Sequence, residues 1–419
     1  MERNGNYDVV VVGGGCAGVT AAVGAVKAGA STLLIERNSY LGGEATNAGI
    51  TAFCGFYSCG GNPVRVVEGV GSEVLEEMDK IGPTYEHIVS VSGNHNFNFD
   101  SEYLKIALDN LMEDENVDFL LHTVLTGAKV EDGKIVSIQC SDDEGSFTIA
   151  AKNFVDATGD ANLVHLAGGE TGWGDEEGNP MVATLTFRLS NVDTSRDLTP
   201  AAVEKAVKKG KEAGLPYMTR EKGFILKRAG SNIVSVLLPS MQPEGMTGAD
   251  LTEMERNGRK QVLSYVKALT TYLPGMEDAQ LAVIGPSLGF RETRRMIGRD
   301  TITTEDVLER RKRSDGVARG GWKPEIHKSL VQLGTYIEVK DGSWFDIPLG
   351  ALQSKTIGNL FGAGRIVSSD PTAYAAVRVM GTCFATGHAA GAAAACQARD
   401  GVADAETIRA ELVKQNALI

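Results

Sequence analysis

A run of valines that ends in a cluster of glycines constrains this chain more than any other feature. Residues 9–18 read VVVVGGGCAG. β-branched residues in an unbroken apolar run favour a strand that is buried on both faces of a sheet. Gly13, Gly15 and Gly18 fit the G-x-G-x-x-G pattern, which permits a tight turn, close approach of the backbone to a pyrophosphate, and close packing of the next helix on the strand. The small residues that follow predict a helix over 17–30, with Gly29 at its C-terminal cap.

The second strand decides how the glycine pattern is interpreted, because glycine-rich turns alone are common. Residues 32–35 form an apolar segment that ends in Glu36. This acid lies close to the ~20-residue separation expected of a carboxylate that accepts the ribose hydroxyls of a dinucleotide. The helix between the two strands would direct its N-terminus at the phosphates. The segment therefore predicts a dinucleotide-binding unit.

Length and charge narrow the class of protein. A chain of 419 residues has room for two or three domains, since a domain takes roughly 100–200 residues. The net charge of −13 disfavours a nucleic-acid partner. The first strand follows the N-terminus too closely for a secretory segment, and the weakly polar stretch 381–398 is too small-sided to span a bilayer. We expect a cytoplasmic protein with no membrane contact.

The six cysteines are scattered, without the paired spacing of metal ligands. We therefore expect reduced thiols in apolar packing and no metal site.

The order of periodic segments predicts an α/β fold with a discontinuous Rossmann-like domain. A helix after Asp100 is followed by strands with the hairpin signal Asp132-Gly133, which indicates an inserted β-meander. The meander ends in two further strands, 147–149 and 153–155. We assign residues 1–170 to the first part of the cofactor domain, 171–342 to an α+β substrate domain, and 343–419 to the returning part of the cofactor domain.

The sequence of motifs resembles the FAD-dependent oxidoreductase family of the glutathione-reductase-like superfamily. In that family an arginine follows the acid of the second strand, Gly-Gly comes next, and Ala-Thr-Gly follows the β-meander. Here these positions are Arg37, Gly42-Gly43 and Ala157-Thr158-Gly159. The resemblance covers nearly the whole chain and implies FAD as the cofactor, with the residues after Gly-Gly near the isoalloxazine ring.

One position departs from the pattern. Many relatives end the last cofactor strand in Gly-Asp, and the acid holds a ribityl hydroxyl. Here Gly364 is followed by Arg365, and the nearest acid is Asp370. Residues 378–395 are small, so a helix there could lie close to a neighbour and direct its N-terminal partial charge at the flavin pyrimidine edge. The alternative is a tightly packed core helix, and the two interpretations are compatible.

These considerations predict a set of FAD contacts. The set comprises Gly13, Gly15, Cys16, Ala17, Gly18, Glu36, Arg37, Gly42, Gly43, Glu44, Ala45, Thr46, Val124, Ala157, Thr158, Gly159, Asp160, Gly364, Arg365, Met380, Gly381 and Thr382.

Arg291 is the first of three candidate catalytic residues. It opens the run Arg-Glu-Thr-Arg-Arg close to the apolar residues 282–284, which we expect to form a buried strand. A charge in such surroundings needs a partner, and an arginine can grip a substrate carboxylate or carbonyl. The alternative is a structural ion pair with Glu292 or Asp306.

His327 and Arg378 are the other two candidates. His327 follows a Gly-Gly-Trp-Lys-Pro segment that predicts a loop, where an imidazole could take a proton as hydride leaves. The alternative is an ordinary surface histidine. Arg378 precedes the small-residue helix and could steady a reduced, anionic flavin.

The pattern supports an oxidoreductase that moves a hydride between a small organic molecule and flavin N5. A second G-x-G-x-x-G after a strand is absent from the sequence, so electrons would pass to oxygen, a quinone or a redox partner protein. The alternatives are a disulfide reductase that uses Cys54 and Cys59, a non-catalytic electron-transfer subunit, and, less favoured, a nucleic-acid-modifying flavoprotein. A homo-oligomer is compatible with each of them.

Overall fold

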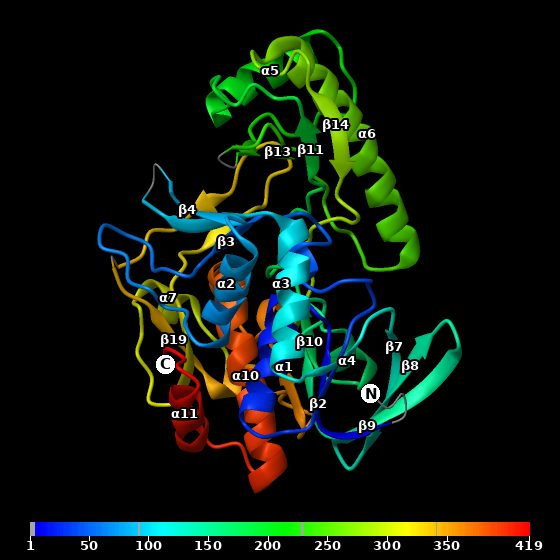
Figure 1. The fold of residues 1–419 in the computed structure, drawn as a ribbon, viewed down its shortest axis with the longest axis vertical. Helices are drawn as coiled ribbons and strands as arrows, with labels where there is room; N and C mark the ends of the chain where they lie inside the picture. Colours follow the sequence, from blue (N-terminus) through cyan, green and yellow to red (C-terminus); the bar gives the residue numbers. More distant parts are fainter. Residues whose placement is uncertain (1–4, 91–92, 228–229, 341) are drawn as a thin grey trace.

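The chain folds into a large lobe and a smaller lobe in the computed structural model (Figure 1), which describes residues 5–90, 93–227, 230–340 and 342–419. The large lobe contains both termini and a central parallel sheet. The small lobe, green in Figure 1, holds its own sheet and two helices.

The parallel sheet is the predicted Rossmann-like unit. β1 (Asn6–Val12) pairs in parallel with β2 (Thr32–Ile35) and β9 (Gly145–Asp156). β6 (Asp118–Leu120) extends the sheet beyond β2, and β20 (Leu360–Gly362) pairs with β9. The valines of residues 9–12 are buried, as an apolar strand covered on both faces requires. The α/β fold class is confirmed.

The β-meander differs from the prediction in one respect. β7 (Val124–Glu131) and β8 (Lys134–Asp142) form the expected hairpin, with positive φ at Asp132 and Gly133. The strands expected at 147–149 and 153–155 are one continuous strand, β9. Its first half pairs antiparallel with β8 and its second half parallel with β1. One strand therefore joins the meander to the central sheet without a turn.

Helices α1 (Cys16–Lys27) and α10 (Met380–Asp400) pack with almost no space between their backbones. A Cβ atom on Gly387 would lie 2.1 Å from the Ala17 carbonyl oxygen, and one on Gly391 would lie 1.9 Å from the Ala21 carbonyl oxygen. The small residues of the C-terminal helix are thus required by packing. Because residues 17 and 21 meet residues 387 and 391 in the same order, the two helices run in the same direction.

The small lobe has a separate core. Its antiparallel sheet has the order β12 (Phe224–Leu226), β13 (Val234–Leu237), β11 (Phe187–Ser190), β14 (Gln280–Ile284). α5 (Pro200–Glu212) and α6 (Gly248–Tyr272) cover it (Figure 1), and Phe187, Val236 and Tyr265 are fully buried. The prediction of a buried strand at 282–284 is wrong: β14 is an edge strand, and Val283 is 46% exposed.

The remaining elements complete the large lobe and the junction. They are α2 (Val70–Ile81), α3 (Ser101–Asp114), α4 (Asn162–Leu166), α7 (Thr304–Leu308), α8 (Leu349–Leu352), α9 (Pro371–Val377), α11 (Ala405–Lys414), the 3₁₀ turns η1 (Gly43–Ala45) and η2 (Gly364–Ile366), β3 (Ala52–Cys54), β4 (Tyr85–Val89), β5 (His95–Phe99), β10 (Thr171–Trp173), β15 (Arg294–Met296), β16 (Gly316–Gly320), β17 (Glu325–Ile326), β18 (Thr335–Tyr336) and β19 (Phe345–Pro348).

No helix within the described residues has the length and apolarity to cross a bilayer.

The helix pair yields a test of the packing. Gly391→Ala should lower the free energy of unfolding by about 3 kcal/mol, because the added methyl overlaps a backbone oxygen that cannot move alone. Gly248→Ala, where an added Cβ meets nothing within 4 Å, is the matched control and should change stability by less than about 1 kcal/mol. Urea unfolding followed by circular dichroism measures both, and equal effects would contradict the packing argument.

Candidate flavin and substrate site

The three motif glycines have different surroundings. Gly13 has φ +102°, and a Cβ on Gly18 would lie 1.7 Å from the Gly13 carbonyl oxygen. A Cβ on Gly15 would instead meet only Gly43 Cα, at 3.7 Å. Gly13 and Gly18 are therefore required by the fold, whereas a side chain at Gly15 would point into space suited to a ligand.

Glu36 ties the second strand to the glycine turn. Its Oε2 accepts from the Gly14 amide at 2.6 Å, and its Oε1 accepts from the Asn38 amide at 2.8 Å. The side chain is buried. Arg37, the next residue, is exposed, and so is Val124, which follows Thr123, whose amide donates to the Glu36 carbonyl at 2.9 Å. These hydrogen bonds fix the carboxylate beside the glycine turn.

The predicted Gly-Gly pair forms a second turn against the first. Gly42 and Gly43 have φ of +111° and +56°, and Gly42 N donates to the Gly14 carbonyl at 2.8 Å. Residues 43–45 form η1, and the Thr46 hydroxyl donates to the Leu41 carbonyl at 2.7 Å. The two glycine turns therefore form one backbone surface.

The Asp-Ala-Thr-Gly-Asp turn is shaped by its first acid. The buried Asp156 carboxylate accepts from the Thr158 amide and hydroxyl at 3.0 and 2.7 Å, and from the Val164 amide at 2.9 Å. Burial raises the pKa of Asp156, although these hydrogen bonds oppose the shift. A Cβ on Gly13 would lie 2.6 Å from the Ala157 carbonyl oxygen, so this turn borders the glycine turn directly.

Arg365, which stands where many relatives have aspartate, is neutralised by two acids. Its Nη2 lies 3.1 Å from Glu44 Oε1 and 3.6 Å from Asp160 Oδ1, and its Nη1 donates to the Phe290 carbonyl at 2.5 Å. Asp370 is not part of this group, because it caps α9 through the Ala373 amide at 2.8 Å. The acids near this position therefore come from elsewhere in the chain.

The start of α10 offers polar groups without protein partners. The N-cap residue Val379 makes no side-chain cap, and the first turn contains no acid. The buried Thr382 hydroxyl has no hydrogen-bond partner in the described part of the chain. A Cβ on Gly381 would lie 2.5 Å from the Gly55 carbonyl carbon, which fixes the helix start against residues 54–56.

These residues fit FAD. α1 also begins without a side-chain cap, so two helix N-termini can receive the negative groups of a dinucleotide. From the register of Ala17 on Gly387, α10 extends about six residues, or about 9 Å, beyond the start of α1. One N-terminus suits the pyrophosphate and the other suits the flavin ring system.

The three predicted catalytic residues converge on Glu325, an acid that the sequence analysis missed. His327 Nε2 lies 3.0 Å from Glu325 Oε1, and Arg378 Nη2 donates to the Glu325 carbonyl at 2.9 Å. Arg291 Nη1 donates to the Val182 carbonyl at 2.8 Å, and the Val182 amide donates to the His327 carbonyl at 2.9 Å. Residues distant in the sequence thus form one cluster at the junction of the lobes.

The alternative explanation for Arg291, a structural ion pair, does not hold. Glu292 pairs with Arg295, and Asp306 pairs with Arg311 at 2.9 Å. Burial and the charge of Arg378 lower the pKa of Arg291 to about 9. The guanidinium is therefore poorly compensated by the protein.

His327 lies in irregular structure directly after β17, as predicted, but it is buried, so the alternative of an ordinary surface histidine does not hold. Burial and the charge of Arg291 lower the pKa of His327 to about 3, against the opposing effect of Glu325. Burial also opposes ionisation of Glu325, but its hydrogen bond from His327 and the nearby cations hold the pKa of this acid well below its usual range. Since an ionised carboxylate only accepts, His327 carries its proton on Nε2, and Nδ1, buried without a partner in the described residues, is the acceptor.

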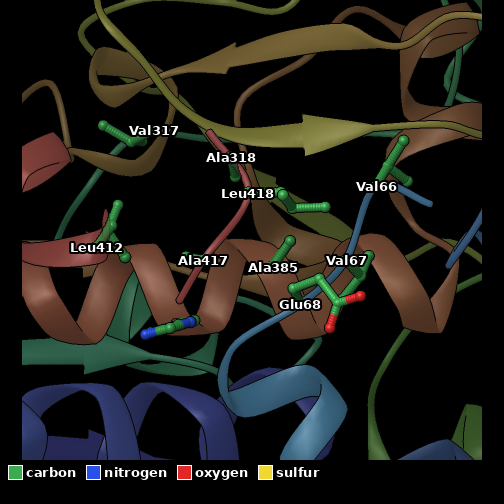
Figure 2. A pocket seen from close by; sticks show the side chains of 10 residues that line it. Val66, Val67, Glu68, Val317, Ala318, Ala385, Leu412, Ala417 and Leu418 are labelled. Atoms are coloured by element: carbon green, nitrogen blue, oxygen red, sulfur yellow. The ribbon is translucent and has the colours of Figure 1, made fainter. Parts of the chain in front are cut away.

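The small cavity lined by Val66, Val317, Leu412 and Leu418 is not part of this site (Figure 2). It holds about 10 Å³, which is room for about one water molecule.

The two cysteines of the disulfide-reductase alternative lie in an apolar environment. Cys59 packs with Trp322 and Val379, and Cys54 borders this group. Both are free thiols. Burial raises the pKa of Cys54 to about 12 and also raises the pKa of Cys59. Thiolates, the reactive form, are therefore disfavoured at both positions.

The apolar environment of Cys54 and Cys59 predicts that the flavin is the only group that takes up electrons. Anaerobic dithionite titration should take up two electrons per flavin in the wild type and in Cys59→Ser, because neither thiol exchanges with the flavin. Uptake of four electrons by the wild type, reduced to two in Cys59→Ser, would establish the disulfide reductase instead.

The glycine geometry predicts different outcomes for two similar substitutions. Gly15→Ala should fold with wild-type stability but bind flavin at least tenfold more weakly, because its methyl occupies only the ligand's space. Gly18→Ala should fail to fold or lose about 3 kcal/mol, since its methyl overlaps the Gly13 carbonyl. Flavin absorbance after gel filtration and thermal unfolding separate the two effects. Full flavin occupancy in Gly15→Ala would contradict the site.

Curated relatives match parts of the chain. Digeranylgeranylglycerophospholipid reductase of Thermoplasma volcanium is 26% identical over 216 residues, 46% of this chain and 49% of that protein. The tRNA uridine 5-carboxymethylaminomethyl modification enzyme MnmG of Geotalea uraniireducens is 27% identical over 178 residues, 40% of this chain and 27% of that protein. The chain spans half or less of the length of these relatives.

Solved structures resemble the chain over nearly its full length. The p-nitrophenol 4-monooxygenase PnpA of Pseudomonas putida superposes with a TM-score of 0.50 at 12% identity, covering 99% of this chain and 84% of that one. BexE superposes with a TM-score of 0.51 at 14% identity, covering 98% and 66%. At these identities the likeness concerns the fold.

A protein-family model matches nearly the whole chain. The model described as FAD dependent oxidoreductase matches residues 8–416, which include both glycine turns, the junction cluster and the α10 start. The chain belongs to the FAD-dependent oxidoreductase family, and it is an enzyme with FAD as its cofactor.

Proposed function

We propose that the enzyme transfers a hydride between a small organic substrate and flavin N5, and that it belongs to the glutathione-reductase-like branch of flavoproteins. The observation that carries the proposal is the convergence of Arg291, His327 and Arg378 on Glu325. This cluster adjoins the start of α10, since Arg378 stands two residues before Met380.

His327 supplies the proton acceptor. Glu325 holds the imidazole through Nε2 at 3.0 Å and thereby directs the lone pair of Nδ1 to the substrate side. Because the pKa of His327 is near 3, the imidazole is neutral at physiological pH, and its Nδ1 can act as a proton acceptor of low basicity.

Arg291 and Arg378 hold and orient the substrate. Arg291 is fixed by the Val182 carbonyl and Arg378 by the Glu325 carbonyl, so neither head group has to search for its position when substrate enters. The bound FAD supplies the two-electron chemistry, and the chain's residues position the reacting carbon and manage its proton.

The substrate is a small molecule. The tRNA-modifying relative suggests nucleic acid, but the net charge of −13 opposes a polyanionic partner. The reductase relative favours an organic compound. Oxygen, a quinone or a redox protein would exchange electrons with the flavin in the other half-reaction. The proposal is compatible with a homo-oligomer.

Anaerobic bleaching of the flavin by a panel of alcohols, amines and acids tests the proposal. With a reducing substrate, His327→Asn should slow flavin reduction by about 10²-fold or more while FAD stays bound. His165→Asn, an exposed histidine, is the matched control and should behave as the wild type.

The wild-type rate should be constant between about pH 5 and pH 8, because the basic form of His327 is already fully populated above its pKa of about 3. Equal rates in the wild type and His327→Asn would remove this histidine from the site. A rate that rises through pH 6.5 would indicate a base with an ordinary histidine pKa.

A further inference from the structure

A fourth cation, Arg220, belongs to the region of this cluster. It comes from the small lobe, between α5 and β12, and is 2% exposed. Its Nη2 donates to the Ser240 hydroxyl at 3.2 Å, and its amide is bonded to the Tyr265 hydroxyl at 2.8 Å. Ser240 is followed by Met241, which pairs with Ala183, and the neighbouring Val182 carbonyl accepts from Arg291. The two arginines are therefore held by adjacent segments, and the charge of Arg220 contributes to the lowered pKa of Arg291.

The charges in this region do not balance. Among the described residues, no carboxylate lies within ion-pair distance of Arg220 or Arg291, and Arg378 has Glu325 at 4.0 Å. Glu44, the other acid nearby, is paired with Arg365 at 3.1 Å. Glu325 is therefore the one carboxylate that acts on both Arg291 and Arg378, and the described residues provide none for Arg220. Buried cations without anions are costly, and a fold that retains them keeps a place for an anion.

Several buried polar atoms point to the same conclusion. The Nε atoms of Arg220 and Arg378 and the Nδ1 atom of His327 are buried without hydrogen-bond partners in the part of the chain that the structure describes. Native proteins satisfy nearly all such groups. Arg378 and His327 both contact Glu325, and Arg220 is bonded to Ser240, next to the Met241–Ala183 pair that borders the Arg291 partner Val182. We infer that the missing partners of these atoms belong to a ligand.

We propose that the substrate carries a carboxylate, which Arg220 of the small lobe and Arg291 hold together, with Arg378 beside them. This inference rests on the substrate position proposed above and adds Arg220 as a residue that determines specificity. The planar donor fork of arginine matches a carboxylate. The same fork also matches a phosphate, so inorganic phosphate is tested beside acetate.

Acetate is the probe, with acetamide as its neutral isostere. Added to the FAD-loaded enzyme at constant ionic strength, acetate should perturb the flavin absorbance saturably, whereas acetamide should not. The Kd for acetate should rise at least tenfold in Arg220→Met and stay unchanged in Arg256→Met, a surface arginine of the same lobe with 62% side-chain exposure. No saturable response to acetate, equal binding of acetamide, binding of inorganic phosphate alone, or an unchanged Kd in Arg220→Met would overturn the proposal.

Thermal unfolding separates a role of Arg220 in anion binding from a role in the stability of the fold. Without acetate, Arg220→Met should unfold at the wild-type temperature or above it, since it removes an uncompensated buried charge. Acetate should raise the unfolding temperature of the wild type only. An unfolding temperature several degrees below wild type would show that Arg220 serves the fold and would overturn its assignment to an anion.

The two proposals can fail separately. If acetate binds through Arg220 but no organic compound reduces the flavin, the proposed anion site is supported and the proposed hydride transfer is contradicted. If neutral compounds reduce the flavin equally in the wild type and Arg220→Met, the proposed hydride transfer is supported and the proposed substrate carboxylate is contradicted.

Discussion

The contact between the backbones of α1 and α10 is the constraint on which the rest of the structure depends. Glycine at positions 387 and 391 lets the two helices approach until a single methyl group would overlap a carbonyl oxygen. Because they run in the same direction, both N-termini point to one side of the central sheet. Neither N-terminus has a side-chain cap, so the same packing that stabilises the core also creates two adjacent positions for negative charge.

The site extends from this side of the sheet to the small lobe. Arg378 is placed by the large lobe at the end of α9, Arg220 comes from the small lobe, and Arg291 lies in the segment that returns from it. Glu325 and His327 contact each other, and Arg378 donates to the Glu325 carbonyl. A substrate that neutralises these cations would also contact both lobes. The protein retains an electrostatic cost in its free form, as sites selected for ligand binding often do.

The sequence predicts the local parts of this arrangement well and the distant parts poorly. The glycine turn and Glu36 could be identified because strand, turn and acid lie within one βαβ unit with fixed spacing. The helix that starts after Asp100 could also be identified, since a cap depends on neighbouring residues. The different environments of Gly15 and Gly18 could not, because they depend on which atoms lie opposite each glycine.

Glu325 and Arg220 escaped prediction for a physical reason. Neither stands in a local motif, and each becomes significant only through contacts that the fold creates between distant segments. The same holds for β14: its apolar residues suggested a buried strand, but its place at the sheet edge leaves them exposed. The residue type of His327 predicts a proton acceptor. The residues next to it in the sequence do not indicate that it is buried, and burial lowers its pKa.

The crystal structure of the FAD-loaded enzyme with acetate tests the account most directly. The account predicts that the flavin lies at the α10 N-terminus, within hydrogen-bond distance of the Thr382 hydroxyl. It also predicts that acetate lies between the guanidinium groups of Arg220 and Arg291, with His327 Nδ1 facing the same space. A flavin away from α10, or an acetate-free junction in which the arginines are paired with protein carboxylates, would contradict it.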